Sequence, residues 1–217
     1  MDFLVMLGPP GAGKGTLNRL LSDRFGYRPV STGEVIRREM ANPDSPFGQA
    51  ARPHMDRGDY VPDDLALSLF FSILKPMSDN ARVALDGFPR TIPQAEVFLD
   101  WIQKEGHAFH GCVFLDVDVD TAVKRMRDRR VCRDCRAPYH LLHRPPKVAE
   151  VCDLCGGPVI PREDDDPERV ARRLRRFQEQ TNPLLQWFAE RDKRFRLDGA
   201  LAPEENADRV AEHFQLT

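Results

Sequence analysis

Four of the five cysteines stand in two Cys-x-x-Cys pairs within the stretch VCRDCRAPYHLLHRPPKVAEVCDLCGG, Val131 to Gly157. Two tight turns that each supply two thiolates can hold one tetrahedral metal ion and leave no coordination position for water. We therefore expect a structural Zn²⁺ rather than a catalytic one, and iron or redox-active thiols are the alternatives. The predicted ligands are Cys132, Cys135, Cys152 and Cys155.

A second chemical motif lies near the amino terminus, in LGPPGAGKGT from Leu7 to Thr16. Glycines allow backbone N–H groups to turn toward a polyphosphate, and a helix that starts here adds the positive end of its dipole. Lys14 can reach β- and γ-phosphates, and the Thr16 hydroxyl can bind Mg²⁺. The spacing departs from G-x-x-x-x-G-K-[ST] because Gly15 stands between Lys14 and Thr16, so a simple glycine-rich turn is the alternative. We predict a nucleoside triphosphate site made by Gly11, Ala12, Gly13, Lys14, Gly15 and Thr16.

The elements around these motifs indicate a parallel α/β sheet. Short, almost wholly apolar runs predict buried strands, in DFLVMLG, RVALDGF, CVFLDVDV and FRLDG. Amphipathic or charged helical stretches alternate with them, at residues 14–26, 93–106, 119–130 and 167–193. Strands that alternate with helices favour a P-loop NTPase-type parallel sheet flanked by helices.

Two segments interrupt this alternation and read as insertions at the sheet's edge. Residues 31–61 predict short helical pieces with Pro and Gly breaks, and residues 131–163 carry the paired cysteines. The segment with the cysteines has few large apolar side chains, so a bound metal would have to supply the stability that burial does not. We expect a single domain over 1–217, with a core of 1–30, 62–130 and 164–217.

Composition limits the classes of function. The chain has 217 residues, 41% hydrophobic and 30% charged, and a formal net charge of −2. A near-neutral balance argues against a protein devoted to nucleic acid, where a strongly basic domain is expected. The first apolar run is too short for a signal peptide, and no run approaches the roughly 18 apolar residues of a membrane span. We therefore expect a cytoplasmic protein that binds neither membrane nor nucleic acid.

Three motifs, in order, carry a resemblance to a known family. GPPGAGKGT, STGEVIR (Ser31 to Arg37) and LDGFPRTIPQA (Leu85 to Ala95) resemble the adenylate kinases, and CRDC…CDLCGG followed by PREDDDPERVARRL resembles the lid of the zinc-bearing, long-lid members. The resemblance extends from Met1 to about Gly199. It implies Mg²⁺-dependent, reversible transfer of the γ-phosphoryl group of ATP to AMP, giving two ADP, in adenine nucleotide homeostasis. It also implies that 31–61 and 131–163 are mobile subdomains, an NMP-binding insertion and a zinc-containing lid.

The resemblance assigns roles residue by residue. In the AMP site it implies Thr32, Arg37, Val61, Gly87, Arg90 and Gln94, together with Arg162 and Arg173. In the ATP site it adds Arg125 and Arg129 to the glycine-rich loop, with Arg125 packed on the base. Thr16 and Asp86 would hold Mg²⁺ through water, and Asp164 and Asp165 would lie at the lid hinge. Lys14, Arg90, Arg129, Arg162 and Arg173 would stabilise the transferred phosphoryl group.

The residues agree with that chemistry on physical grounds. Phosphoryl transfer between two polyanions chiefly requires positive groups around the transferred phosphoryl group. Arginine suits this role because it binds phosphate oxygens with two parallel donors. No general base is needed, because a phosphate acceptor with a second pKa of about 6 is mostly ionised at pH 7. None of the scattered histidines is therefore nominated as catalytic.

Two residues depart from what close relatives would carry, and other functions stay open. Tyr60 stands beside the expected AMP base where an aliphatic residue is common, and Phe177 stands where a tyrosine is common. The alternatives are a nucleoside monophosphate kinase that prefers GMP, UMP or CMP, and a zinc-ribbon nucleic-acid binder. We expect a monomer, since both substrates would bind within one chain.

Overall fold

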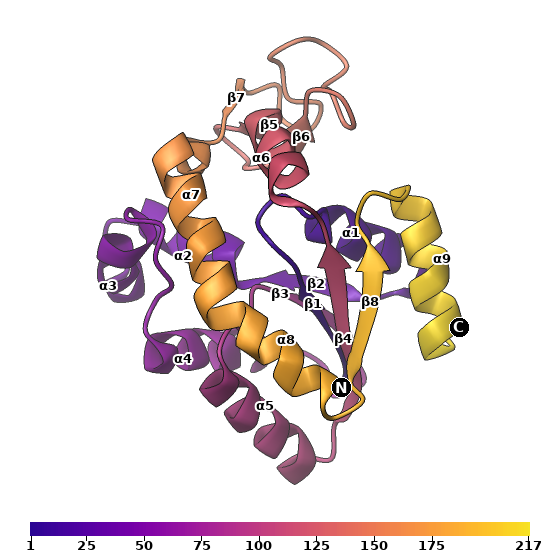
Figure 1. Cartoon of the computed structure of the whole chain (residues 1–217). Coiled ribbons are helices and arrows are strands. Elements are labelled where there is room, and N and C mark those ends of the chain that lie inside the picture. The colour runs from indigo at the N-terminus through magenta and orange to yellow at the C-terminus, as the bar shows by residue number, and fades with distance from the viewer.

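The computed structural model describes residues 1–217, except for the side chain of Glu163. Its centre is a five-stranded sheet in the order β2-β3-β1-β4-β8, with every neighbouring pair parallel (Figure 1). The strands, in that order, are β2 (Arg28–Ser31), β3 (Arg82–Asp86), β1 (Asp2–Leu7), β4 (Ala108–Asp116) and β8 (Arg194–Asp198). The expected α/β class and parallel sheet are confirmed.

Helices cover both faces of the sheet because successive side chains of a strand point to opposite sides. Leu4 and Met6 of β1 pack in the cluster formed with α1 (Lys14–Phe25) and α9 (Pro203–Phe214). Phe3, Val5 and Leu7 pack in the opposite cluster, with α4 (Asp63–Leu74), α5 (Ile92–Lys104) and α8 (Asn182–Ala189). This two-sided burial explains why β1 is apolar at nearly every position.

The central position of β1 determines where the site forms. The chain first places β2 and β3 on one side of β1 and later places β4 and β8 on the other. In open α/β sheets a ligand binds beyond the carboxyl ends of the strands, at such a reversal of strand order. The glycine-rich loop follows β1 at this point.

The first predicted insertion consists of two helices, α2 (Thr32–Ala41) and α3 (Pro46–Met55). They pack with α4 through a small apolar cluster, with Ile36, Ala51, Val61 and Leu69 buried at its centre.

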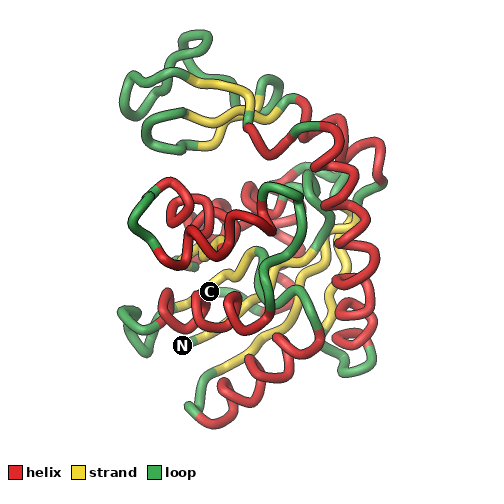
Figure 2. Tube along the Cα trace, turned by 90° about the vertical axis from the view of Figure 1, so that its left-hand side faces the viewer, coloured by secondary structure: helices red, strands yellow, loops and turns green.

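The segment with the cysteines forms a separate three-stranded antiparallel sheet in the order β6-β5-β7, at the end of the molecule from which α6 (Val119–Arg127) and α7 (Pro167–Arg176) descend (Figures 1 and 2). Its strands are β5 (Arg129–Cys132), β6 (Pro138–His140) and β7 (Val159–Pro161). A short 3-10 turn, η1 (Glu163–Asp165), leads from β7 into α7.

Several sequence-based boundaries differ from the structure. The stretch 119–130 gives a helix only to Arg127, since β5 begins at Arg129. The stretch 167–193 is not one regular helix, because a π-helical segment, η2 (Phe177–Thr181), separates α7 from α8. Strand β2 was not predicted, since its four residues begin with exposed Arg28 and Pro29 and carry no apolar run. No helix in the described part of the chain is long and apolar enough to cross a bilayer.

Candidate active site and metal centre

The glycine-rich loop is folded as an anion-binding turn. Gly11 and Gly13 have φ of +85° and +101°, in the left-handed region that favours glycine, and α1 begins directly after Gly13. Within the described residues, the amides of Gly11, Gly13, Lys14 and Gly15 donate no hydrogen bond to another protein group. These N–H groups and the start of α1 form the donor set that a polyphosphate requires.

Lys14 lies at the centre of the charged site. Its Nζ donates to the carbonyl oxygens of Gly8 and Pro9, at 2.9 and 3.1 Å, which directs the side chain back over the loop. Burial lowers the pKa of the Lys14 ammonium to about 8, and although Asp86 opposes the shift, Arg90, Arg173 and Arg129 add to it. The ammonium is still mostly protonated at pH 7 and lies among other cations, so an anion would be stabilised there.

A second group of predicted residues meets at Gly87, directly after β3. The carbonyl oxygen of Gly87 accepts hydrogen bonds from Thr32 Oγ1 at 2.8 Å and from Arg90 Nε at 2.9 Å. Gln94 is only 2% exposed, and its Oε1 accepts from the Arg90 amide at 2.8 Å. Thr32, Gly87, Arg90 and Gln94 are therefore held in one polar network, as neighbours of the loop.

Asp63, at the start of α4, completes this network and was missed by sequence reasoning. Its carboxylate accepts from Gln94 Nε2 at 2.7 Å and from Thr91 Oγ1 at 3.1 Å. An acidic residue after a proline at a helix start also suits the helix dipole, so its position alone does not indicate a role in the site.

Arginines from three separate segments converge on Asp164. Arg162 donates to its carboxylate at 2.5 and 2.9 Å, Arg37 from α2 donates at 3.4 Å, and Arg173 from α7 donates to its backbone carbonyl at 3.1 Å. Burial would raise the pKa of the Asp164 carboxyl, but these guanidinium groups, Arg162 foremost, hold the pKa well below its usual range. Asp164 is thus an anion in a cationic pocket.

Asp165 repeats this arrangement beside it. It receives two hydrogen bonds from Arg129, at 2.7 and 2.5 Å, and one from Arg173 at 3.1 Å. Burial lowers the pKa of both the Arg37 and Arg173 guanidinium groups, which still remain cationic at neutral pH. The structure therefore brings together Arg37, Arg129, Arg162 and Arg173, and two carboxylates occupy the place of anions between them.

The remaining predicted residues lie around this centre. Arg125 of α6 donates to the carbonyl oxygens of Ala12 and Gly199, at 3.3 and 2.9 Å, so it borders the loop on the side of β8. Asp86 ends β3 and is in register with Met6, one residue before the end of β1. Thr16 is exposed in the first turn of α1, and Val61 is buried in the apolar cluster of the first insertion.

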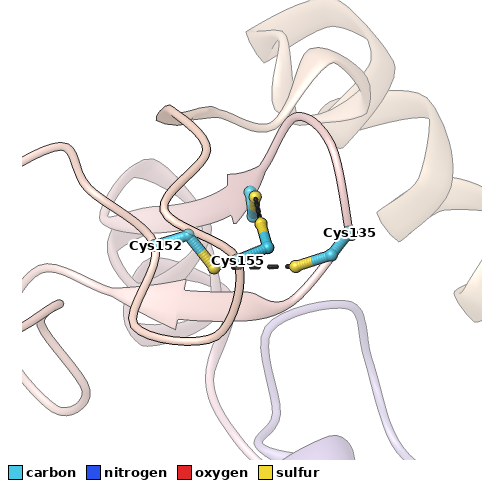
Figure 3. A group of neighbouring side chains, drawn as sticks. Cys135, Cys152 and Cys155 are labelled. Atoms are coloured by element: carbon cyan, nitrogen blue, oxygen red, sulfur yellow. Dashed lines mark hydrogen bonds between the residues drawn. The ribbon is translucent and has the colours of Figure 1, made fainter.

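The four paired cysteines meet as predicted. Their Sγ atoms all lie within 4.8 Å of one another, with Cys132 and Cys152 buried and Cys135 and Cys155 exposed. The shortest approaches run between the pairs, 3.5 Å from Cys132 to Cys155 and 3.6 Å from Cys135 to Cys152 (Figure 3). Four sulfur atoms at this spacing can hold one metal ion.

A tyrosine hydroxyl beside one of the cysteines also favours the binding of a cation there. Tyr139 is 4% exposed, and its hydroxyl lies 3.3 Å from Cys152 Sγ while it accepts from the Asp153 amide at 2.8 Å. Because that amide supplies the hydrogen to the oxygen, the Tyr139 hydrogen is free to point at sulfur. The contact with Tyr139 lowers the pKa of the Cys152 thiol to about 6, which favours the thiolate that binds metals.

The chain is similar to known proteins over most of its length. The family model described as adenylate kinase matches residues 6–193. Among curated proteins, an adenylate kinase of Clostridium tetani is 36% identical over 96% of each chain, and one of Finegoldia magna is 38% identical over 95% of this chain and 96% of its own. An adenylate kinase of Methanocella arvoryzae is 37% identical over 92% of this chain and 91% of its own. The match covers most of the chain, and the chain belongs to the adenylate kinase family.

Proposed function

We propose that the protein catalyses reversible, Mg²⁺-dependent transfer of the γ-phosphoryl group of ATP to AMP, giving two ADP. The observation that carries this proposal is that positive side chains from separate elements converge around one anion-binding centre. They are Lys14, Arg37 of α2, Arg90, Arg129 of β5 and Arg173 of α7. Such a centre suits a transition state that spreads negative charge over phosphoryl oxygens. The names of the relatives support the choice of ATP and AMP.

Two different sets of residues would bind the two nucleotides. Gly11, Ala12, Gly13, Lys14, Gly15 and Thr16 would hold the phosphates of ATP, with Arg125 against its base and Arg129 on its phosphates. The acceptor would be held by Thr32, Arg37, Val61, Gly87, Arg90 and Gln94, with Arg162 and Arg173 between the two nucleotides. Gln94 would exchange its bond to Asp63 for the base, since both ends of its amide are now engaged.

The transfer itself needs no proton movement. An oxygen of the AMP phosphate attacks the γ-phosphorus, the bond from that phosphorus to the β-γ bridging oxygen breaks, and ADP leaves with the bonding electrons. The AMP phosphate is already mostly ionised at pH 7. Mg²⁺ would supply positive charge that offsets the charge of the transferred phosphoryl group, and Thr16 and Asp86 would hold it through water.

We assign segments 31–61 and 131–163 as mobile NMP-binding and lid subdomains of one domain, with the core formed by the rest. Phosphates that bind between the arginines would take the places of Asp164 and Asp165. Closure of the lid would then exclude water, which would otherwise accept the phosphoryl group. We assign structural Zn²⁺ to the four cysteines, and a cytoplasmic monomer as the working state.

A coupled assay of ADP formation tests the proposal. With MgATP as donor, AMP is expected to turn over at least about tenfold faster than GMP, CMP or UMP, because a site that hydrogen-bonds one base leaves polar groups unpaired with another. Arg90→Ala is expected to abolish most of the activity. Equal or faster turnover with GMP would mean that AMP is not the preferred acceptor. No turnover with any of the four nucleotides would overturn the proposal.

A further inference from the structure

Arg90 is fixed on two sides before any substrate is present. Its Nε donates to the Gly87 carbonyl at 2.9 Å, and the central carbon of its guanidinium lies 4.5 Å from the centroid of the Tyr60 ring. A cation at this distance from an aromatic ring is attracted to the ring. The hydrogen bond fixes one edge of the guanidinium, and Tyr60 fixes its plane.

Tyr60 is itself held in place through Thr181. Its hydroxyl lies 3.1 Å from Thr181 Oγ1, which in turn donates to the backbone carbonyl of Arg90 at 3.3 Å. A threonine hydroxyl has one hydrogen, so Thr181 must accept from Tyr60 in order to donate to Arg90. The three residues therefore close a ring of contacts, with the tyrosine against the guanidinium and its hydroxyl tied to the same arginine's backbone.

Thr181 reaches this place because it ends the π-helical segment η2. A π-helical turn takes in an additional residue and so turns the following side chains about the helix axis, and such turns are frequent at functional sites. The Thr181 residue is only 2% exposed. A regular helix over 167–193, as the sequence predicted, gives no reason to expect this contact.

We infer that Tyr60 and Thr181 are positioning residues that hold Arg90 ready for the phosphate of the acceptor nucleotide. The inference rests on the proposed function for the role of Arg90. A free arginine loses side-chain freedom when it binds, so an arginine that is already fixed binds phosphate more tightly. Because Tyr60 is the last residue but one of segment 31–61 while Thr181 and Arg90 belong to the core, these contacts also connect that insertion to the phosphate site.

Steady-state kinetics with four variants test the inference. Tyr60→Leu is expected to raise KM for AMP about tenfold, by loss of the cation–π contact, with kcat and KM for ATP within about twofold of wild type. Tyr60→Phe is expected to raise KM for AMP about threefold, by loss of the hydrogen bond to Thr181, and Thr181→Val, which also loses the bond to the Arg90 carbonyl, is expected to raise it at least as much. The double variant Tyr60→Phe/Thr181→Val should be no worse than Thr181→Val alone, since Thr181→Val already removes the bond that Tyr60→Phe removes. Tyr27→Phe, a buried tyrosine on the opposite side of the sheet, serves as the matched control and should match wild type.

An NMR measurement separates this inference from the proposed function. The Nε–H resonance of Arg90 should be shifted by the Tyr60 ring in substrate-free protein, and the shift should be lost in Tyr60→Leu and kept in Tyr27→Phe. An unshifted resonance in wild type, or a Tyr60→Leu enzyme with unchanged KM for AMP, would overturn the positioning role even if the wild type is an active AMP kinase. A shifted resonance in a protein that does not phosphorylate AMP would instead overturn the proposed function.

Discussion

The two inserted segments, 31–61 and 131–163, are similar in length but are stabilised in different ways. The first is a helical pair that packs with α4 over an apolar cluster, in which Ile36 of α2 and Leu69 of α4 are buried and several other apolar side chains are partly buried. In the second, two of the five residues of the buried cluster are cysteines, and Tyr139 is the one aromatic residue of that cluster. One insertion can be stable through burial alone, whereas the other would depend on the metal ion that we propose for its four sulfur atoms.

Metal removal should give the largest difference in stability between the two segments. A structural Zn²⁺ contributes about 10–16 kcal/mol to the folding of small zinc domains, far more than a sheet of this size gains by burial. Chelation should therefore abolish hydrogen-exchange protection in β5, β6 and β7 and leave α2 and α3 protected. Phosphoryl transfer should fall about 100-fold, because the arginines beside the lid are no longer aligned.

Hydrogen exchange read by mass spectrometry checks this prediction, with zinc added back as the control. A metal-free protein that retains protection in the lid strands would contradict the stated difference between the two insertions.

The next largest effect is expected where the two insertions meet. Arg37 of the first insertion pairs with Asp164, which follows the second. Asp164→Asn leaves Arg37, Arg162 and Arg173 without this anion in a largely buried place, so the free energy of unfolding should fall by about 3 kcal/mol. Urea unfolding measures the loss, and Asp44→Asn, which removes an exposed carboxylate, is the matched control.

The same contact predicts a pH dependence. The pKa of Asp164 is held below its unfolded value, so its contribution to stability is present above about pH 4 and is lost as pH falls through the lower, folded pKa. Wild type should therefore lose stability more steeply than Asp164→Asn below about pH 4. If the free energy of unfolding fell equally steeply with pH in the two proteins, the ionised Asp164 would not be stabilised by the arginines.

Gly48→Ala tests the apolar insertion by itself. A Cβ on Gly48 would come within 2.2 Å of the Glu39 carbonyl oxygen of α2, so the two helices would have to separate. The expected cost is about 1–3 kcal/mol, as for other overpacked sites. Thermal unfolding should register it, whereas the zinc affinity of the lid should not change. A variant as stable as wild type would mean that α2 and α3 do not need this close approach.

A smaller change is expected from the hydrogen bond to Cys152. Tyr139→Phe removes the hydroxyl that lies 3.3 Å from Cys152 Sγ and keeps the ring. Loss of such a partner to a metal ligand costs about tenfold in metal affinity. Competition with a chromophoric chelator measures it, and Tyr27→Phe controls for the loss of a buried tyrosine hydroxyl. Equal zinc affinity in the two variants would assign Tyr139 to packing alone.

The sequence predicted the parts of the fold and site whose chemistry requires particular residue types. The strand β1, the loop around Lys14 and the four cysteines need apolar, glycine or sulfur side chains at fixed spacing, and the structure has the fold elements and the sulfur cluster where they were expected. The sequence did not predict β2, because exposed Arg28 and Pro29 carry no apolar pattern and the strand pairs with β3 through its backbone. The π turn before Thr181 was also missed, because Phe177 and its neighbours suit an α-helix equally well and tertiary contacts decide between the two.

The smallest expected effect lies within the metal centre, where the two cysteine turns are not equivalent. Each turn closes with the amide after its second cysteine donating to the carbonyl of its first, and the residue there has a left-handed conformation, Arg136 at φ +62° and Gly156 at φ +74°. A residue with a Cβ has a cost of about 1–2 kcal/mol in this conformation, which glycine does not have. Arg136→Gly should therefore tighten zinc binding about fivefold, and Gly156→Ala should weaken it by a similar factor. Arg136→Ala, which removes the charge but keeps the Cβ, should bind zinc as wild type does. If Arg136→Ala tightens binding as much as Arg136→Gly, the difference between the turns comes from charge beside the metal rather than from the backbone.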